Sequence, residues 1–259
     1  MKLLIVLFVL TITLLTPGTA LDVPPEHLLL EGKKLLRQGS ILNDKSLLLE
    51  GRTLLERAHE LQPSVTTLYY LAQSEHELVR VGLSEPESDL FDRYYESAVR
   101  RAQEVIRQRE EWSEGYALLS SLYGLKIARS WINAPVLGPR AYGLAEEAVR
   151  RDSANPRAWL VRGMMKLNAP SVFGGSAEEA LESFQRSIAL FERSGGQGAL
   201  EPDWGYIDAL VWFGWAQQKE GRLTEAMSAY EKALQAEPRA AWVRQMFIVP
   251  LEKKISDAR

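Results

Sequence analysis

Cysteine is absent from the 259 residues of the sequence. This absence excludes disulfide bonds, thiol nucleophiles and metal sites with cysteine ligands. Histidine is scarce, because only His27, His59 and His76 occur, and no His-Glu-x-x-His pattern is present. The common zinc-hydrolase arrangement and the Gly-x-Ser-x-Gly nucleophile turn are therefore both missing. We predict a protein that is not an enzyme and that needs no metal or other cofactor.

An excess of positive charge is also lacking. The sequence has 31 Lys and Arg against 34 Asp and Glu, and its formal net charge is −3. Binding to nucleic acid or to an anionic membrane surface calls for clustered positive charge, so neither is favoured. Hydrophobic residues make up 46% of the chain, which can supply a core without disulfide support.

The first twenty residues indicate a secretory signal peptide. Lys2 precedes a short apolar stretch, residues 3–15, and the small residues Gly18 and Ala20 follow it. This stretch is shorter than the roughly 20 residues that span a bilayer, although an uncleaved anchor is the alternative. We expect residues 1–20 to be removed and residues 21–259 to form one domain. The product is expected to be periplasmic or secreted, not inserted in the membrane, and not lipidated, since no cysteine follows the apolar core.

The clearest internal pattern lies near the C-terminus. Gly214 follows Leu210 by four residues, and Ala226, Ala233 and Pro238 follow at intervals of 12, 7 and 5. Small residues allow two helix backbones to approach closely, and proline ends the second helix because it has no backbone N–H. The pattern therefore predicts a pair of antiparallel helices with a turn at residues 220–222. These residues resemble the tetratricopeptide repeat, whose signature is a set of small and aromatic residues at this spacing.

Similar spacings recur towards the N-terminus, with Trp159 and Gly163, then Tyr116 and Ser120, and then Tyr69 and Gln73. The resemblance covers most of residues 26–250. It implies an all-α fold, a right-handed α-solenoid of four to five helix pairs plus a C-terminal capping helix; a generic helical bundle is the alternative. We expect the capping helix over residues 240–254, with an apolar stripe of Trp242, Met246 and Val249. Pro250 is expected to kink or end it.

The first four units depart from a regular repeat. We predict insertions between their two helices near residues 39–46, 79–91, 129–139 and 168–176. Insertions at one kind of corner lie on one edge of a solenoid, where loops often carry function. Two of them share Asn-Ala-Pro, at residues 133–135 and 168–170.

Two interpretations of this edge stay open. In the first, each Asn ends a helix in a left-handed conformation and Phe173 packs under its loop. In the second, the edge is a ligand or partner site that includes the backbone amides near Gly174 and Gly175. Its side chains would be those of Arg129, Trp131, Asn133, Asn168 and Phe173.

A concave groove is the second candidate surface. In such repeats the first helix of each pair lines the groove, and positions three and four apart share its inward face. This places the following residues in the groove: Tyr70, Ser74, Arg157, Leu160, Met164 and Trp215. An apolar groove suits an amphipathic helix from a partner, or the protein's own N- or C-terminal helix. A further loop, residues 194–206, joins the last two units, and we expect Trp204 to pack as a plug.

The function that follows is a non-catalytic protein-interaction scaffold of the periplasm, with another protein or peptide as its partner. The alternative is a small-ligand-binding subunit that resembles the periplasmic tetratricopeptide component of some solute transporters. That component is usually lipidated, and the missing cysteine argues against the match. The sequence leaves the partner and the oligomeric state open.

Overall fold

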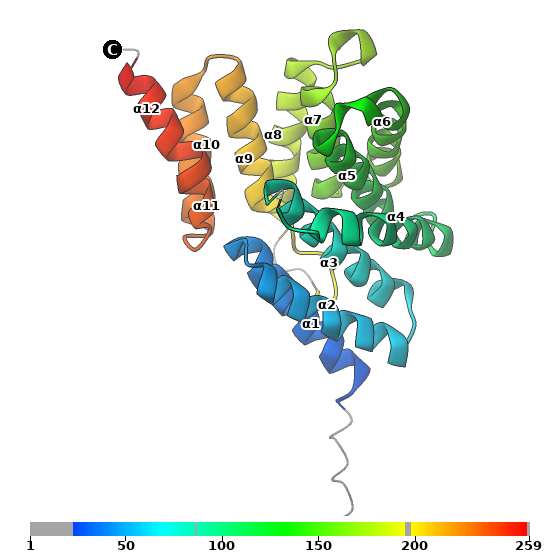
Figure 1. Ribbon diagram of the computed structural model, residues 1–259. Helices are drawn as coiled ribbons and strands as arrows, with labels where there is room; N and C mark the ends of the chain where they lie inside the picture. Colours follow the sequence, from blue (N-terminus) through cyan, green and yellow to red (C-terminus); the bar gives the residue numbers. More distant parts are fainter. Residues whose placement is uncertain (1–22, 86, 195–197, 258–259) are drawn as a thin grey trace, which may run out of the picture.

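The computed structural model describes residues 23–85, 87–194 and 198–257, and every regular element among them is helical (Figure 1). The predicted signal peptide lies outside these residues. Ten helices form five antiparallel pairs: α1 (Pro25–Leu42) with α2 (Lys45–Leu61), α3 (Val65–Ser84) with α4 (Leu90–Gln108), α5 (Ser113–Arg129) with α6 (Ala134–Arg151), α7 (Pro156–Asn168) with α8 (Ala177–Arg193), and α9 (Tyr206–Lys219) with α10 (Leu223–Ala236). The predicted fold class is confirmed. None of the described helices combines the length and apolar character needed to cross a bilayer.

The pairs stack into a curved array. Each second helix packs on the first helix of the next pair, and α3, α5, α7 and α9 also contact one another in sequence. In Figure 1 the curvature brings the blue N-terminal helix towards the red C-terminal segment. There the indole N–H of Trp242 donates a hydrogen bond to the carbonyl oxygen of Ile41 at 3.1 Å. The two ends of the array therefore meet.

Glycine permits the close packing inside the last two pairs. A Cβ atom at Gly163 would lie 2.5 Å from Cε1 of Phe184, and one at Gly214 would lie 2.5 Å from Cε1 of Tyr230. The small first-helix residue thus makes room for an aromatic ring of the second helix. This explains why both units carry the same combination of glycine and a buried ring.

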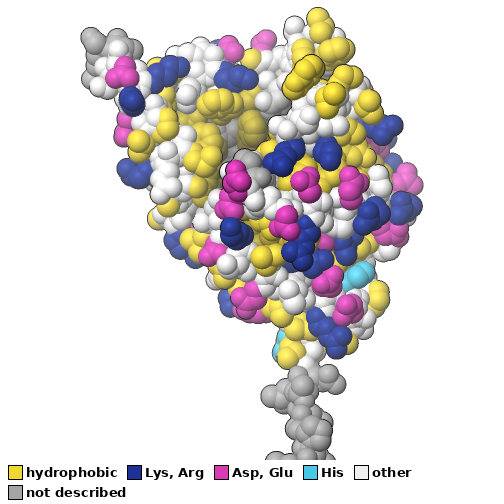
Figure 2. All heavy atoms as spheres, in the orientation of Figure 1, with side chains coloured by type: hydrophobic (Ala, Val, Ile, Leu, Met, Phe, Trp, Pro, Cys, Tyr) yellow, Lys and Arg dark blue, Asp and Glu magenta, His cyan; other side chains and the backbone are white. Residues whose placement is uncertain are grey.

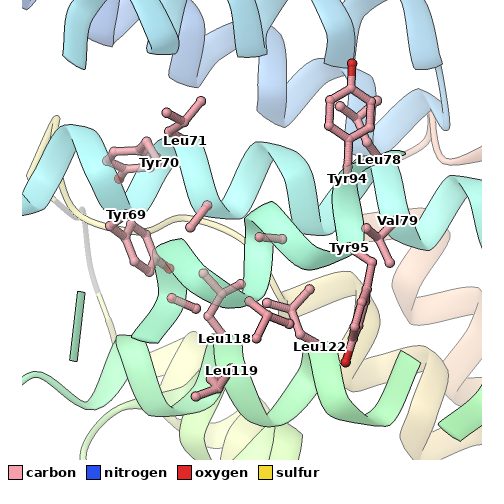
Figure 3. Packing of buried hydrophobic residues seen from close by; sticks show 14 of the residues in the cluster. Tyr69, Tyr70, Leu71, Leu78, Val79, Tyr94, Tyr95, Leu118, Leu119 and Leu122 are labelled. Atoms are coloured by element: carbon pink, nitrogen blue, oxygen red, sulfur yellow. The ribbon is translucent and has the colours of Figure 1, made fainter. Parts of the chain in front are cut away.

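The buried hydrophobic residues form three clusters along the stack, which differ in composition. In the N-terminal half, Tyr69, Leu78, Leu118 and Leu122 pack where α3, α4 and α5 meet (Figure 3). In the C-terminal half, the buried rings of Phe184 and Tyr230 are central. Small side chains join the two halves at α5, α6 and α7: Ala117, Ala145, Ala148 and Ala158.

The predicted insertion at residues 39–46 is wrong. Helix α1 continues to Leu42, and only Asn43 and Asp44 separate it from α2. Asn43 takes the left-handed conformation with φ of 54°, and the Asp44 carboxylate caps α2 by accepting from the N–H of Ser46 at 2.8 Å. The other three connections, residues 85–89, 130–133 and 169–176, are longer than this turn.

The C-terminal segment is a helix with an irregular middle. It consists of α11 (Ala241–Val243), the π-helical turn η3 (Arg244–Ile248) and α12 (Val249–Asp257). The wider π turn comes directly before Pro250, which lacks an N–H, so the helix does not end at the proline. The predicted stripe is wrong, because Met246 and Val249 are exposed. The buried face is instead formed by Val243, Ile248 and Leu251.

Candidate functional site

The concave groove is occupied by the protein's own chain. We call residues 198–205, between α8 and α9, the plug segment. The Tyr70 hydroxyl donates to the carbonyl oxygen of Leu200 at 3.1 Å, and the Lys33 ammonium donates to those of Ala199 at 2.9 Å and Glu201 at 2.6 Å. Groove side chains therefore bind backbone carbonyls, much as they would bind an extended peptide.

Trp204 holds the other end of the plug segment. Its indole N–H donates to the hydroxyl oxygen of Tyr69 at 2.8 Å, and the ring is partly buried against the core. The next residue, Gly205, has φ of +102°, and a Cβ atom there would lie 3.3 Å from side-chain atoms of both Arg157 and Leu160. The groove is filled by an internal loop and not by a terminal helix, which corrects the self-filling alternative.

A buried ion pair lies beneath the plug segment. The Arg157 guanidinium donates to the Glu114 carboxylate at 2.7 Å, and the two side chains are only 6% and 4% exposed. Tyr69 and Asn155 also donate to Glu114, at 3.0 and 2.9 Å. Burial disfavours the charge of Arg157, but the adjacent Glu114 carboxylate raises the pKa of Arg157 above its ordinary value. Arg157 also donates to the carbonyl oxygen of Trp204 at 3.4 Å, which links the pair to the plug.

The predicted groove residues occupy different environments. Tyr70, Arg157 and Leu160 contact or lie beneath the plug segment, as described above. The Ser74 hydroxyl is buried and donates to the carbonyl oxygen of Leu71 at 2.7 Å. Met164 is partly buried, and the partly exposed Trp215 lies edge-on to the ring of Phe247. Partner binding by these six residues stays a prediction.

One constellation near the groove resembles a catalytic triad. Nδ1 of His76 lies 3.1 Å from a Glu77 carboxylate oxygen, and Nε2 lies 2.8 Å from the Ser121 hydroxyl. Because an ionised carboxylate can only accept, Nδ1 donates to Glu77, and in the neutral ring Nε2 then accepts from Ser121. Ser121 is buried in the interior of α5, where the neighbouring backbone N–H groups serve helix hydrogen bonds, so an oxyanion would find no donors.

The same side chains are well suited to a structural role. Glu77 also accepts from Ser40 at 2.8 Å and from Arg80 at 2.9 Å, so the network ties α1, α3 and α5 together. Burial alone would raise the pKa of Glu77, but Arg80, His76 and Ser40 hold it well below its usual range. In the part of the chain that the structure describes, no group of three or more His, Asp or Glu side chains could hold a metal ion.

The edge of the solenoid, unlike the covered groove, is exposed to solvent. The corner between α5 and α6 contains the short helix η1 (Trp131–Asn133), and that between α7 and α8 contains η2 (Ser171–Phe173). We call their large exposed side chains the apolar edge: Trp131, Ile132, Val136, Val172 and Phe173, which are between 59% and 83% exposed. Since α5 and α7 pack side by side, both corners lie at one end of the molecule, at the top in Figure 1. Figure 2 shows hydrophobic side chains gathered there.

The two asparagines support this edge from within. Nδ2 of Asn133 donates to the carbonyl oxygen of Ser130 at 2.9 Å, and Nδ2 of Asn168 donates to that of Met164 at 2.8 Å. Asn133 has φ of −79°, and Asn43 is the one non-glycine residue with positive φ in the described chain. The predicted left-handed asparagines at 133 and 168 are therefore wrong.

The glycine pair shapes the second corner. Gly174 has φ of +87°, and a Cβ atom at Gly175 would lie 1.8 Å from the carbonyl oxygen of Ala169. Their N–H groups donate to the carbonyl oxygens of Ser171 and Pro170, both at 3.0 Å. These amides are therefore already used within the loop. The tight turn projects Phe173 into solvent, so its predicted packing under the loop is wrong.

Arg129 lies at the base of the first corner. Its guanidinium is 5.3 Å from the centre of the Phe91 ring and 3.8 Å from the Asp92 carboxylate. Of the five predicted edge residues, Trp131 and Phe173 thus face solvent. Arg129 contacts α4, and Asn133 and Asn168 bond to carbonyl groups next to their own corners. Sequence reasoning missed Ile132, Val136 and Val172, although all three lie in or beside the loops that it selected.

Comparison with solved structures identifies the fold. A tetratricopeptide-repeat protein of Thermus thermophilus aligns over 85% of this chain and 98% of its own, with 21% identity and a TM-score of 0.59. The HusA haemophore of Porphyromonas gingivalis aligns over 78% and 96%, with 17% identity and a TM-score of 0.63. No family model and no curated protein sequence matches the chain. The protein therefore has the tetratricopeptide-repeat fold.

Proposed function

We propose that this protein is a non-catalytic scaffold that binds another protein through the apolar edge. The observation that carries this proposal is the set of five large hydrophobic side chains in contact with water on two rigid corners. Exposed apolar clusters of this kind mark interaction sites, and aromatic side chains contribute much of the binding energy at protein interfaces. The partner's matching surface is accordingly apolar.

The filled groove supports the choice of the edge over the groove. A partner that entered the groove would have to displace the plug segment and its hydrogen bonds to Lys33, Tyr69 and Tyr70. The edge requires no such displacement. Its loops are also held by internal hydrogen bonds, which lowers the entropy lost on binding.

The test is capture of partners by the exported protein after crosslinking, followed by titration with the purified partner. The double variant Trp131→Ser/Phe173→Ser should weaken binding by about tenfold or more, because each ring is a candidate hot spot. Trp215→Ser is the matched control, since Trp215 is a partly exposed aromatic in the groove region. If the edge variant binds the partner as tightly as wild type and the control variant does not, the partner binds at the groove and not at the edge.

We infer a periplasmic location from the predicted signal peptide. N-terminal sequencing of the protein purified from the periplasm tests this inference. The expected first residue is Leu21; a chain that begins at Met1 in the cytoplasmic fraction would contradict it.

A small-ligand-binding role is the second candidate function. One solved structure with this fold is named a haemophore, so the architecture is compatible with a small-molecule role. A specific observation in this protein also favours the role, namely a cavity lined by a buried side chain that has no hydrogen-bond partner among the described residues.

A further inference from the structure

A cavity of about 120 Å³, partly open to solvent, lies between the two ends of the array. Its walls come from α1, α3, the end of the plug segment with the start of α9, and the segment from α10 to α11. The hydrogen bond from Trp242 to Ile41 closes one side, since both residues line the cavity. The cavity thus exists only because the first and last pairs meet.

Gln73 lies in this wall without a hydrogen-bond partner. It is 4% exposed, and its carboxamide oxygen bonds to no other group among the described residues. A buried amide without a partner costs roughly 1–3 kcal/mol, so such groups are rare unless something binds them. The Gln73 carboxamide is therefore a marker of an occupant.

Asp208 is a second group in the wall, and it lacks a side-chain partner in the described chain. It lies half-buried in the first turn of α9, and no described side chain donates to its carboxylate or forms an ion pair with it. The other charged groups of the wall each form an ion pair. Lys33 and Arg37 pair with Asp203, Arg80 with Glu77, and Glu237 with Arg239. A carboxylate without a side-chain partner calls for an occupant with a hydrogen-bond-donating ammonium group.

The remaining charges restrict the occupant further. The wall holds three cations, Lys33, Arg37 and Arg80, which match three anions, Asp203, Asp208 and Glu237. A simple cation would be attracted by the Asp208 carboxylate but repelled by the two arginines. A molecule that carries both charges can place each charge near a group of opposite sign. A cavity of ~150 Å³ holds benzene, so this one suits a molecule of about five or six heavy atoms.

We propose that the cavity binds a small free amino acid, with its ammonium group on Asp208 and its carboxylate on the side of Gln73, Arg37 and Arg80. This site is separate from the apolar edge and does not depend on it. An occupant that contacts α1, α3 and α9 together would also hold the two ends of the array in place.

The experiment compares three probes of similar size by isothermal titration calorimetry with the exported protein. L-alanine carries both charges, ethylamine lacks the carboxylate, and propionate lacks the ammonium. We expect saturable binding of L-alanine, with ethylamine and propionate weaker by about tenfold or more. If none of the three binds, the cavity holds only water and the proposal fails; equal binding of ethylamine would refute the zwitterion requirement.

Two variants locate the site. Asp208→Asn preserves shape but removes the charge and should weaken L-alanine binding by about tenfold or more. Asp257→Asn, near the C-terminal end of α12, is the matched control and should bind like wild type. Gln73→Leu should lose binding and raise the melting temperature, because it replaces an unpartnered amide with an apolar group of similar size. Circular dichroism checks that each variant folds, and unchanged binding in Asp208→Asn would place the site elsewhere.

Discussion

The inner groove of this solenoid is covered by its own chain, whereas the apolar edge is exposed to solvent. This is the reverse of a solenoid that binds its partner in an open groove. The groove is rich in donors and charges, yet the plug segment covers it and satisfies them. The edge consists of large apolar side chains, yet it faces water. The difference teaches that a surface is available for binding when its own chain leaves it uncovered, whatever its place in the repeat.

The largest effect is expected from breaking the ion pair beneath the plug. Arg157→Met leaves the buried Glu114 carboxylate without its cation and should lower the free energy of unfolding by about 3–5 kcal/mol. Urea denaturation measures this change. Lys232→Met is the control, because its ion pair with Glu192 is exposed and should contribute within about 1 kcal/mol. A loss in Arg157→Met no larger than that of the control would mean that the pair does not anchor the groove.

Two tryptophans test the comparison most directly. Trp204→Ala removes a partly buried ring that donates to Tyr69, and we expect a loss of about 2–4 kcal/mol in unfolding free energy. The plug segment should then be cleaved faster by proteases, since it loses its anchor. Trp131→Ala removes an exposed ring and should change stability by about 0.5 kcal/mol or less. Similar losses in the two variants would mean that the plug is not held as the structure indicates.

The polar network beside the groove predicts a pH dependence. The pKa of Glu77 is lowered in the folded protein, so its contribution is present above the unfolded-state pKa of about 4.3 and is lost as pH falls towards the folded value. Glu77→Gln should therefore be less stable than wild type by about 1–3 kcal/mol at pH 7. The gap should narrow as unfolding is measured from pH 5 down to pH 3. A gap that is constant with pH would exclude the ionised Glu77 as its cause.

The smallest effect on stability is expected at the edge. Phe173→Ser should leave the unfolding free energy within about 0.5 kcal/mol of wild type, because the ring is exposed. It should nevertheless reduce the fluorescence of a dye that binds apolar surfaces, since it removes part of the cluster. Phe184→Ser, in the core, should instead unfold the protein and increase dye binding. Unchanged dye binding in Phe173→Ser would show that the five side chains do not act as one patch.

The sequence predicts the helix pairs well because their signals are local. Gly163 and Gly214 each follow a large apolar residue, Trp159 and Leu210, by four positions. The contact of each glycine with an aromatic ring lies within one pair. The error at residues 39–46 has a local cause as well. Gly39 suggests a loop, but the glycine lies inside α1, where a Cβ atom would come within 2.8 Å of Leu48.

The filling of the groove could not be predicted in this way. Tyr70 and Leu200 are 130 residues apart, and nothing in the composition of the plug segment indicates which carbonyl the hydroxyl binds. Trp204 suggested a plug, because a tryptophan in a glycine-rich loop needs a place to pack. The exposure of Phe173 was missed for a related reason, since its position depends on the turn geometry of Gly174 and Gly175 and not on hydrophobicity.

The contact between Trp242 and Ile41 has a consequence for the evolution and engineering of this chain. Open solenoids tolerate duplication or loss of a unit, because each unit touches only its neighbours. Here the first pair contacts the C-terminal segment that follows the fifth pair. An added or a deleted pair would separate these two ends and break the contact. The contact between the two ends is therefore compatible with only one number of helix pairs, and the length of this solenoid is fixed by its closure.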